Sequence, residues 1–321
     1  MAQPAEETER LIEQLRDPTR SHRALLALLS EAESARPALA KFLRTSRPST
    51  VAEPRLLAVE GLNILKGQEA LDALIEVATE RLADIADPAV RLAEEAVCSA
   101  AARALADFPF SRARQTLLQL LSGKPLVGVA EAFEKLKEPR AAPSLVAWLA
   151  DDFVAESALR ALTAIGRAAV PFLLVALRHR PCGDRPEPGG SQRRRARILQ
   201  QLAALAGPDA VTILERHLSD PVEAVRWEAA RALVRHGNDD QNRSALRVAL
   251  EMLDSSDSAL RADCEDLLTE DFQWCREMVE EEIRKRQAQG EPEKPLTPRE
   301  STLEVLLRVH RRRSKPEKVQ P

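Results

Sequence analysis

The sequence predicts an all-α protein, and its composition gives the first two reasons. The chain has 321 residues, 44% hydrophobic and 30% charged, so it holds enough apolar material for a large core. Ala, Leu, Arg and Glu, which are strong helix formers, dominate the chain. Only 3% of residues are aromatic and only 11 are glycine, whereas β-sandwiches and barrels need aromatic and β-branched faces and glycine-rich turns. Composition therefore argues against an all-β fold.

The third reason is an internal repeat built from two alternating segment types. The first type begins with a proline or a small residue and continues with leucines at helical spacing. Its copies are residues 36–43, 142–149, 170–177 and, in degenerate form, 210–214. Proline is accepted there because the N–H groups in the first turn of a helix have no partner within the helix. Each copy therefore predicts a helix, which we name helix A.

The second segment type, which we name helix B, opens with an aspartate and continues with an alanine-rich face. Its copies begin at Asp87, Asp151, Asp220 and Asp257. Where proline follows the aspartate, we expect an N-cap and a first-turn proline, and Gly166 and Gly237 mark helix ends. One A–B pair cannot bury its apolar side alone, so about seven pairs between Ser34 and Gln289 are expected to stack into a curved rod.

The combined pattern resembles the HEAT-like repeats of the phycobilisome-lyase type. Its elements are Asp-Pro, Val-Arg, Ala-Ala-x-Ala-Leu and Pro-x-Leu-Leu, most clearly in residues 220–237 and 170–177 and more broadly over residues 87–272. The resemblance implies an α-solenoid of the HEAT/armadillo kind, a superhelix of antiparallel helix pairs. It also implies aspartate–arginine pairs between neighbouring repeats. The matching positions are Asp87 with Arg91, Asp220 with Arg226 and Asp257 with Arg261, whereas Ala155 breaks the series after Asp151.

The expected organisation is a long solenoid with a short C-terminal addition. We assign residues 1–289 to the solenoid, with a degenerate N-terminal third, residues 290–298 to a linker, and residues 299–321 to a basic helix and tail. Proline and glycine crowd residues 180–191, which predicts a protruding loop inserted between a helix A and a helix B.

The C-terminal helix has two interpretations. Its apolar side, with Leu303, Leu306, Leu307 and His310, would cap the end of the rod. Alternatively, its basic residues would bind nucleic acid or an acidic surface. Those basic residues are Arg308, Arg311, Arg312, Arg313, Lys315 and Lys318.

A first candidate site is a basic group in the inserted loop and the helix after it. Its members are Arg185, Arg193, Arg194, Arg195 and Arg197. The group would bind an anion, either a nucleic-acid phosphate or an acidic partner. Alternatively, the arginines are solvated and cover Leu199 and Leu202.

A second candidate site comes from a recurring Arg-Ala-Leu triplet. With the leucine facing the core, the arginine projects near the edge of the inner surface, so stacked repeats would align Arg103, Arg160 and Arg231. Trp227 lies one turn before Arg231 and would join it as an exposed anchor, since Trp and Arg are frequent hot spots of interfaces. The alternative is that arginine merely suits exposed helix positions and that Trp227 packs on its neighbour.

No catalytic residues, metal site or cofactor are predicted. The sequence lacks phosphate-binding, dinucleotide-binding, HExxH, GxSxG and EF-hand motifs. No two histidines stand at the spacing of metal ligands, and adjacent acidic residues on a helix point apart rather than forming a pair for acid–base chemistry.

A cytoplasmic location without membrane attachment is expected. Residues 1–7 lack the basic and apolar regions of a secretory signal. The longest apolar run, residues 168–177, is about half the ~20 residues that a membrane span needs. The four cysteines have no CxxC spacing, which fits reduced thiols.

These features favour a non-catalytic scaffold or adaptor that holds a protein partner on the concave face of the solenoid. The alternative is a nucleic-acid-binding rod similar to the HEAT-like alkylpurine DNA glycosylases, using the basic loop or tail. A net charge of -3 and a pI near 6.1 argue against a dedicated DNA binder. A chromophore-lyase activity is suggested only by the label of the repeat, and the low aromatic content offers little to stack a tetrapyrrole against.

Overall fold

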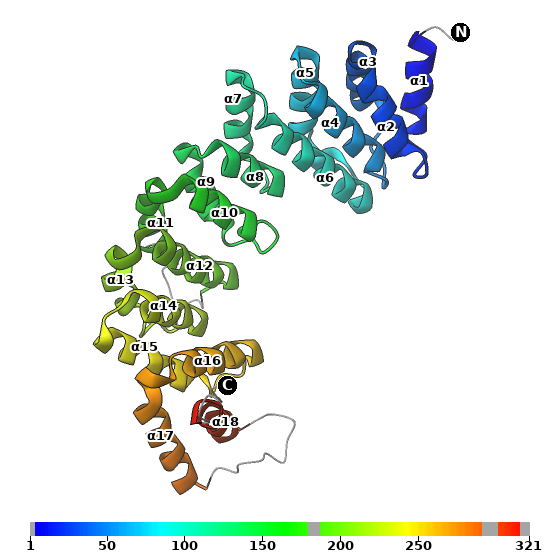
Figure 1. Cartoon of the computed structure of the whole chain (residues 1–321). Coiled ribbons are helices and arrows are strands. Elements are labelled where there is room, and N and C mark those ends of the chain that lie inside the picture. Colours follow the sequence, from blue (N-terminus) through cyan, green and yellow to red (C-terminus); the bar gives the residue numbers. More distant parts are fainter. Residues whose placement is uncertain (1–3, 179–186, 291–300, 315–321) are drawn as a thin grey trace, which may run out of the picture. The chain divides into compact units, whose positions relative to one another are not determined.

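The computed structural model describes residues 4–178, 187–290 and 301–314. Within these ranges the chain is all-α, with eighteen α-helices, four short 3-10 helices and no strand. Helices pack in sequential pairs, as they do in α-solenoids (Figure 1). The chain divides into two compact units, Met1–Phe172 and Leu173–Pro321, named unit 1 and unit 2 below.

Unit 1 consists of two layers of helices. Its A layer holds α1 (Pro4–Gln14), α3 (Ala32–Thr45), α5 (Gln68–Ala78) and α7 (Ser111–Leu120), each packed on the next. Its B layer holds α2 (Ser21–Ser30), α4 (Glu53–Leu65), α6 (Pro88–Leu105), α8 (Val127–Leu136) and α10 (Ala155–Ile165), again in contact in this order. The short helix α9 (Ala142–Trp148) packs on α10, and the 3-10 helices η1 (Leu82–Asp84), η2 (Pro139–Ala141) and η3 (Gly166–Ala169) lie in connections.

Unit 2 continues the alternation. Helix α11 (Val170–Arg178) begins in unit 1 and ends in unit 2. The B layer of unit 2 holds α12 (Gly189–Ala206), α14 (Glu223–His236) and α16 (Ser258–Glu270). Its A layer holds α13 (Val211–Arg216), which follows η4 (Gly207–Ala210), and then α15 (Asp239–Met252) and α17 (Phe272–Ala288). The last helix, α18 (Thr302–Ser314), packs on both α16 and α17.

Two B helices begin as their aspartates predict. The carboxylate of Asp87 accepts a hydrogen bond from the backbone N–H of Ala89 (2.8 Å). The carboxylate of Asp257 accepts from Ala259 (2.9 Å) and Leu260 (3.3 Å). The predicted pairing of Asp87 and Asp257 with arginines of neighbouring repeats is wrong. Each carboxylate caps the N-terminus of its own helix and forms no ion pair within the described residues.

Asp220 differs from these caps. Helix α14 begins three residues later, at Glu223, and Asp220 is buried. Its carboxylate pairs with the guanidinium of Arg195 on α12, while Arg226 donates to its backbone carbonyl oxygen (2.7 Å). An aspartate–arginine pair between repeats therefore exists here, but its arginine is Arg195 and not Arg226.

The predicted loop at residues 180–191 is shorter than expected at its C-terminal end. Helix α12 begins at Gly189, directly after Pro188, so residues 189–191 are helical. The two glycines occupy the first turn, where N–H groups need no partner within the helix and the cost of glycine is small. Residues 180–186 of the predicted loop lie outside the described residues, and Glu187 and Pro188 form no helix.

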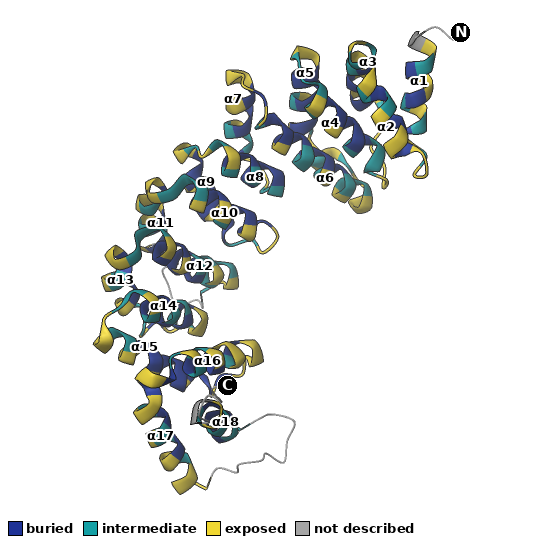
Figure 2. Cartoon of the chain, in the orientation of Figure 1, coloured by how far each residue is buried: buried dark blue, intermediate teal, exposed yellow. Residues whose placement is uncertain are grey.

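Small residues set the spacing of the B layer. Ala101, Ala158 and Ala230 are completely buried, as expected if alanine allows close approach of helices. Between α6 and α8, a Cβ atom on Gly128 would lie 1.7 Å from the carbonyl oxygen of Ser99, so only glycine fits. Figure 2 shows that buried residues lie where the helices of each unit face one another.

Helix α18 covers the end of unit 2. Its buried residues are Thr302, Leu303, Val305, Leu306 and Val309, and Leu307 is half-buried. Arg308 donates to both carboxylate oxygens of Glu265 on α16, at 2.6 Å each. The ring of His310 meets that of Phe272 edge to face, with 5.9 Å between ring centres. These contacts support the interpretation of α18 as a capping helix.

One described segment has the length and apolar character of a membrane span. It is Ala155–Arg178, with 24 residues and a mean hydropathy of 1.6. Gly166, at a φ of +75°, and the 3-10 helix η3 divide it into α10 and α11, of 11 and 9 residues. Neither helix reaches the ~20 residues that a span requires.

Candidate functional site

The described residues contain neither a cluster that could hold a metal ion nor a reactive buried thiol. No group of three or more His, Cys, Asp and Glu side chains in ranges 4–178, 187–290 and 301–314 is arranged to hold a metal ion. Burial raises the pKa of the Cys98, Cys264 and Cys275 thiols to about 12. These thiols are therefore protonated and poor nucleophiles at neutral pH.

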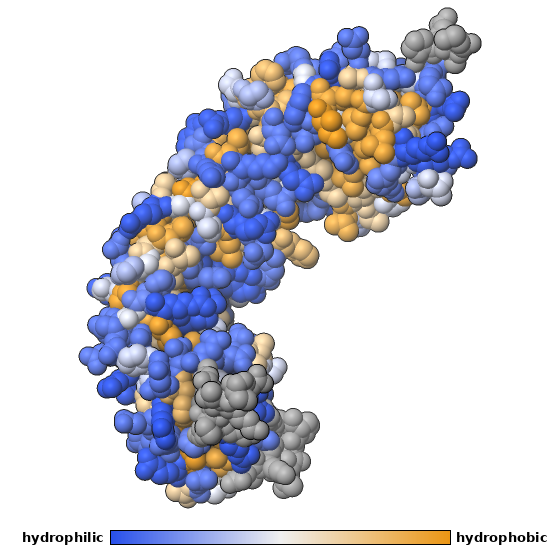
Figure 3. Space-filling model, in the orientation of Figure 1, coloured by the Kyte–Doolittle hydropathy of each residue, from blue (hydrophilic) through white to orange (hydrophobic). Residues whose placement is uncertain are grey.

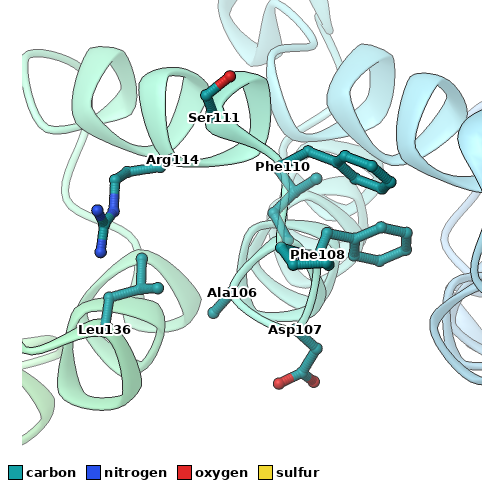
Figure 4. Close-up of a pocket in the computed structure, with 9 residues that line it drawn as sticks. Ala106, Asp107, Phe108, Phe110, Ser111, Arg114 and Leu136 are labelled. Carbon is teal, nitrogen blue, oxygen red and sulfur yellow. The ribbon is translucent and has the colours of Figure 1, made fainter.

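A pocket of about 500 Å³ lies between the end of α6, the start of α7 and the end of α8 (Figure 4). Arg114 and Leu136 face it, whereas the rings of Phe108 and Phe110 point away from Arg114. The Arg114 guanidinium lies 3.7 Å from the carboxylate of Glu138. The pocket therefore does not present an unpaired cation to a ligand.

A groove of about 450 Å³ crosses the B layer of unit 1. Its apolar lining residues are Leu56, Leu57, Val59, Ala100 and Ala104, from α4 and α6. Its polar lining residues are His22, Glu53, Glu60, Asn63, Arg103, Asp107 and Lys135. An apolar floor with a polar rim is the usual anatomy of a surface that binds protein.

Large aliphatic side chains stand exposed on the same helix faces as this groove. They are Leu26 (68% exposed), Ile64 (55%) and Leu92 (69%). Leu26 lies one turn after His22, and Ile64 lies one turn after Glu60. Leu92 lies three turns before Arg103. Each therefore shares a helix face with a lining residue of the groove. Figure 3 shows apolar residues gathered over α2 and α4. We name Leu26, Ile64 and Leu92 the aliphatic patch.

Ion pairs connect neighbouring helices of the B layer of unit 1. Arg103 on α6 pairs with Glu131 on α8 (3.2 Å), and Arg160 on α10 pairs with the same Glu131 (3.7 Å). Arg160 also contacts Glu134 on α8 (3.2 Å). The two arginines are thereby neutralised by carboxylates of the helix between them.

Asp107 is held in a similar way near the end of α6. Its two carboxylate oxygens accept from Lys135 (3.0 and 3.1 Å), and one accepts from the Asn63 amide (3.2 Å). Partial burial raises the pKa of Asp107, but these hydrogen bonds outweigh burial and hold the pKa below its ordinary 3.8. The carboxylate is therefore ionised and paired.

The B layer of unit 2 carries a groove of different composition. It has a volume of about 590 Å³ and lies among α12, α14 and α16. Its apolar lining residues are Ala196, Pro221, Val222, Ala224, Trp227, Ala259 and Leu260. Four carboxylates line it, those of Glu223, Glu228, Asp257 and Asp263, and neither lysine nor arginine is among its lining residues. We name it the acidic groove.

A comparison with protein families identifies the helix pairs of one part of unit 2. Residues 189–269, from the start of α12 into α16, match a family model described as HEAT repeats. The chain contains HEAT repeats. The resemblance that the sequence motifs indicated is thus confirmed for the region that includes residues 220–237.

Several solved structures are similar to the chain at low sequence identity. Human deoxyhypusine hydroxylase in complex with glycerol is 19% identical and covers 82% of this chain and 95% of its own, with a TM-score of 0.32. An engineered protein is 18% identical, covering 94% and 87%, with a TM-score of 0.34. The complex of CpcE and CpcF of phycocyanin lyase from Nostoc is 18% identical, covering 84% and 96%, with a TM-score of 0.28. No curated protein matches the chain.

The helix packing of unit 1 brings together two of the three arginines of the predicted row. Arg103 and Arg160 lie on one B layer and share Glu131. Arg231 belongs to unit 2 and pairs with Glu228 on its own helix (2.6 Å). A single row through all three arginines stays a prediction.

The predicted anion site is wrong at its centre. Arg195 is completely buried, and its guanidinium pairs with Glu187 (2.5 Å) and Asp220. It lies on the same face of α12 as Leu199 and Leu202, which are also buried, and that register signals a core position. Of the other members, Arg193 is exposed, Arg194 and Arg197 are half-buried, and Arg185 lies outside the described residues.

Trp227 also differs from the prediction. It is 7% exposed and is not an exposed anchor, because it lies one turn before the buried Ala230 and packs into the layer. Its remaining surface lines the acidic groove. The sequence analysis missed this groove and the aliphatic patch, although Glu223 and Trp227, four residues apart, already indicated an acidic and aromatic face on α14.

Proposed function

We propose that the chain is a non-catalytic scaffold that binds a segment of a partner protein along the B layer of unit 1. The observation that carries this proposal is the aliphatic patch, in which three side chains more than half exposed lie on α2, α4 and α6, the helices that supply most residues of one groove. Single exposed aliphatic residues are common, but a patch beside a groove is typical of protein-binding surfaces. Stacked helix pairs of this kind commonly offer such extended surfaces.

The charges of this surface favour a protein partner over nucleic acid. Arg103, Arg160 and Lys135 are each paired with a carboxylate. Phosphate binding depends on unpaired basic side chains that displace counterions, and these three residues would first have to lose their partners. A cytoplasmic location is part of the proposal, and the free thiols of Cys98, Cys264 and Cys275 support it.

The test is partner recovery on the full chain carrying an affinity tag. Leu26→Ser, Ile64→Ser and Leu92→Ser are combined in one variant, and Val175→Ser, at an equally exposed aliphatic residue of α11, is the matched control. We expect one protein to co-purify in stoichiometric amount with the wild type and the control. Its recovery should fall at least about tenfold with the triple variant, the effect of losing ~1.4 kcal/mol of binding free energy. Equal recovery by all three proteins would remove the aliphatic patch from any interface.

A second measurement separates protein from nucleic-acid binding. The full chain is mixed with duplex DNA at low and high salt in a gel-shift experiment. We expect no shift even at low salt. A shift that disappears at high salt and in the combined variant Arg103→Glu, Arg160→Glu and Arg231→Glu would contradict the scaffold proposal and restore the arginine row as a phosphate-binding surface.

A further inference from the structure

The acidic groove of unit 2 differs in chemistry from the pocket beside Arg114 and from the groove in the B layer of unit 1. Its floor is apolar, with Trp227 and Leu260 almost buried, and its rim carries four carboxylates from α14 and α16 and the turns before them. A hollow of about 590 Å³ remains open among α12, α14 and α16. The groove is therefore large enough for side chains of a bound segment.

Most of the negative charge of this groove has no cationic partner. Of the four carboxylates that line the groove, only that of Glu228 pairs with a cation, the Arg231 guanidinium at 2.6 Å. The carboxylate of Glu223 accepts from the hydroxyl of Ser255 (2.7 Å), and Asp257 caps its own helix, so both are bound to neutral donors. Glu223, Asp257 and Asp263 form no ion pair within the described residues.

This combination selects one kind of ligand. A lysine or arginine side chain has an aliphatic stem that packs on apolar surface and a cationic head that binds carboxylates. An aromatic ring beside the stem adds attraction for the cation. A divalent metal ion does not fit the arrangement, because these carboxylates form no metal-holding group within the described residues. Nucleic acid is repelled by the same charges.

We propose that the acidic groove binds a lysine- or arginine-bearing segment of a partner protein. The stem of the basic side chain lies against Trp227 and Leu260, and its head group binds among Glu223, Asp257 and Asp263. This site is separate from the aliphatic patch, lies on the other unit and binds basic rather than apolar side chains. It therefore extends the proposed function without depending on it.

The test measures binding of short synthetic peptides to the full chain. Fluorescein-labelled peptides of alternating alanine with arginine, lysine or glutamate are titrated with wild-type protein, and binding is followed by fluorescence anisotropy. The groove variant combines Glu223→Gln with Asp263→Asn. The control combines Glu251→Gln with Glu281→Gln, which removes the same charge from exposed positions of α15 and α17 outside the groove.

We expect both basic peptides to bind the wild type and the control, and the glutamate peptide to bind neither. The groove variant should bind the basic peptides at least about tenfold more weakly, because two charge-assisted contacts are lost. Equal weakening in the groove variant and the control would show a mere net-charge effect and overturn the proposal. Absence of binding to the wild type would overturn it as well.

One further outcome would assign the groove to the chain itself. If the wild type binds no basic peptide but the variant Lys315→Ala with Lys318→Ala does, the basic tail of the same chain is the occupant, and the proposal of a partner segment fails. Because the aliphatic patch is intact in every variant of this experiment, none of these results decides the test of the proposed function. The two proposals therefore fail independently.

Discussion

On the B layer of unit 1 the charged side chains pair with one another across neighbouring helices, while on the B layer of unit 2 they surround an open groove. Arg103, Glu131 and Arg160 form a continuous chain of ion pairs over α6, α8 and α10. Glu223 and Asp263 face the acidic groove without a cation. The same helix pairs thus present an aliphatic surface with balanced charge in one unit and an anionic surface in the other. What decides the difference is whether the neighbouring B helices supply oppositely charged residues at facing positions.

The interiors of the two units are more alike than their surfaces. Each contains a buried arginine that joins consecutive repeats. Arg55 on α4, 5% exposed, lies 3.1 Å from Glu80 and 3.1 Å from Glu94 on α6. Arg195 on α12 is completely buried between Glu187 and Asp220. A buried arginine pair is therefore part of the repeat interior in both units.

The largest effect is expected from removing one of these buried arginines. Arg195→Met removes the guanidinium that pairs with the buried Asp220 carboxylate, which should cost about 3–5 kcal/mol of the free energy of unfolding. Arg55→Met should cost a similar amount in unit 1. Urea unfolding measures the loss, and amide hydrogen exchange locates it in one unit. Arg216→Met, at an exposed arginine of α13, is the control and should be nearly neutral. A loss for Arg195→Met no greater than for this control would contradict the burial of the pair.

The close packing of the unit 1 B layer is tested at Gly128. In Gly128→Ala the new Cβ atom would meet the carbonyl oxygen of Ser99 at 1.7 Å, so α6 and α8 must move apart. We expect a loss of at least about 1–3 kcal/mol of the free energy of unfolding. Gly123→Ala is the matched control, since its Cβ atom would lie 3.4 Å from the carbonyl oxygen of Leu120, an ordinary contact distance. Equal stability of the two variants would mean that α6 and α8 are not in close contact.

Alanines on the B helices provide the same test in both units. Ala161 on α10 and Ala230 on α14 are completely buried. Ala161→Leu and Ala230→Leu should each overpack a helix contact and lower the free energy of unfolding by about 1–3 kcal/mol. Thermal unfolding of the two variants measures the effect. An unchanged melting temperature for either variant would place that alanine on an exposed face and contradict the register of its helix.

Local sequence signals were sufficient to predict the helix pairs. Proline and aspartate at helix starts, together with alanine-rich faces, act within one or two turns, so the caps at Asp87 and Asp257 and the paired helices followed from the sequence alone. The prediction failed where residues distant in the chain meet. Arg195 was predicted to lie on an anion-binding surface, because its neighbours in the sequence are arginines and because Asp220, 25 residues later, is not recognisable as its partner.

The candidate binding surfaces could not be predicted from the sequence for the same reason. The acidic groove combines Glu223 and Trp227 of one helix with Asp263 of the next B helix, and only the packing of the repeats brings them together. The aliphatic patch was missed because leucine in a helix is ordinarily assigned to the core. Leu92 and Leu26 break that rule, since they lie on the solvent-facing side of their helices. Helical periodicity predicts which residues share a face, but not which face a neighbouring repeat covers.

A pH measurement sharpens the contrast between the two surfaces. Burial raises the pKa of Glu228 in the acidic groove above its ordinary 4.5, although Arg231 partly opposes this shift. Between pH 4.5 and the raised pKa the folded state holds a proton that the unfolded state has lost, so stability falls as pH rises. Relative to wild type, Glu228→Gln should therefore gain stability as pH increases from 4.5, measured by urea unfolding. Glu280→Gln should show a smaller change of opposite sign, because hydrogen bonding from Arg276 lowers the pKa of Glu280. Parallel curves for Glu228→Gln and wild type would contradict the shift.

The smallest effect is expected from the exposed ion pairs of unit 1. Arg160 has a side chain 42% exposed, and its contacts with Glu131 and Glu134 compete with water. Arg160→Gln should lower the free energy of unfolding by only about 0.2–1 kcal/mol, and high salt should reduce the difference further. Arg231→Gln is the matched change in unit 2, and it should cost more and respond less to salt, because Glu228 is largely buried. If the two variants lost equal free energy of unfolding with equal salt dependence, the ion pairs of the two layers would be equally exposed to solvent. The distinction between a balanced surface and an acidic groove would then fail.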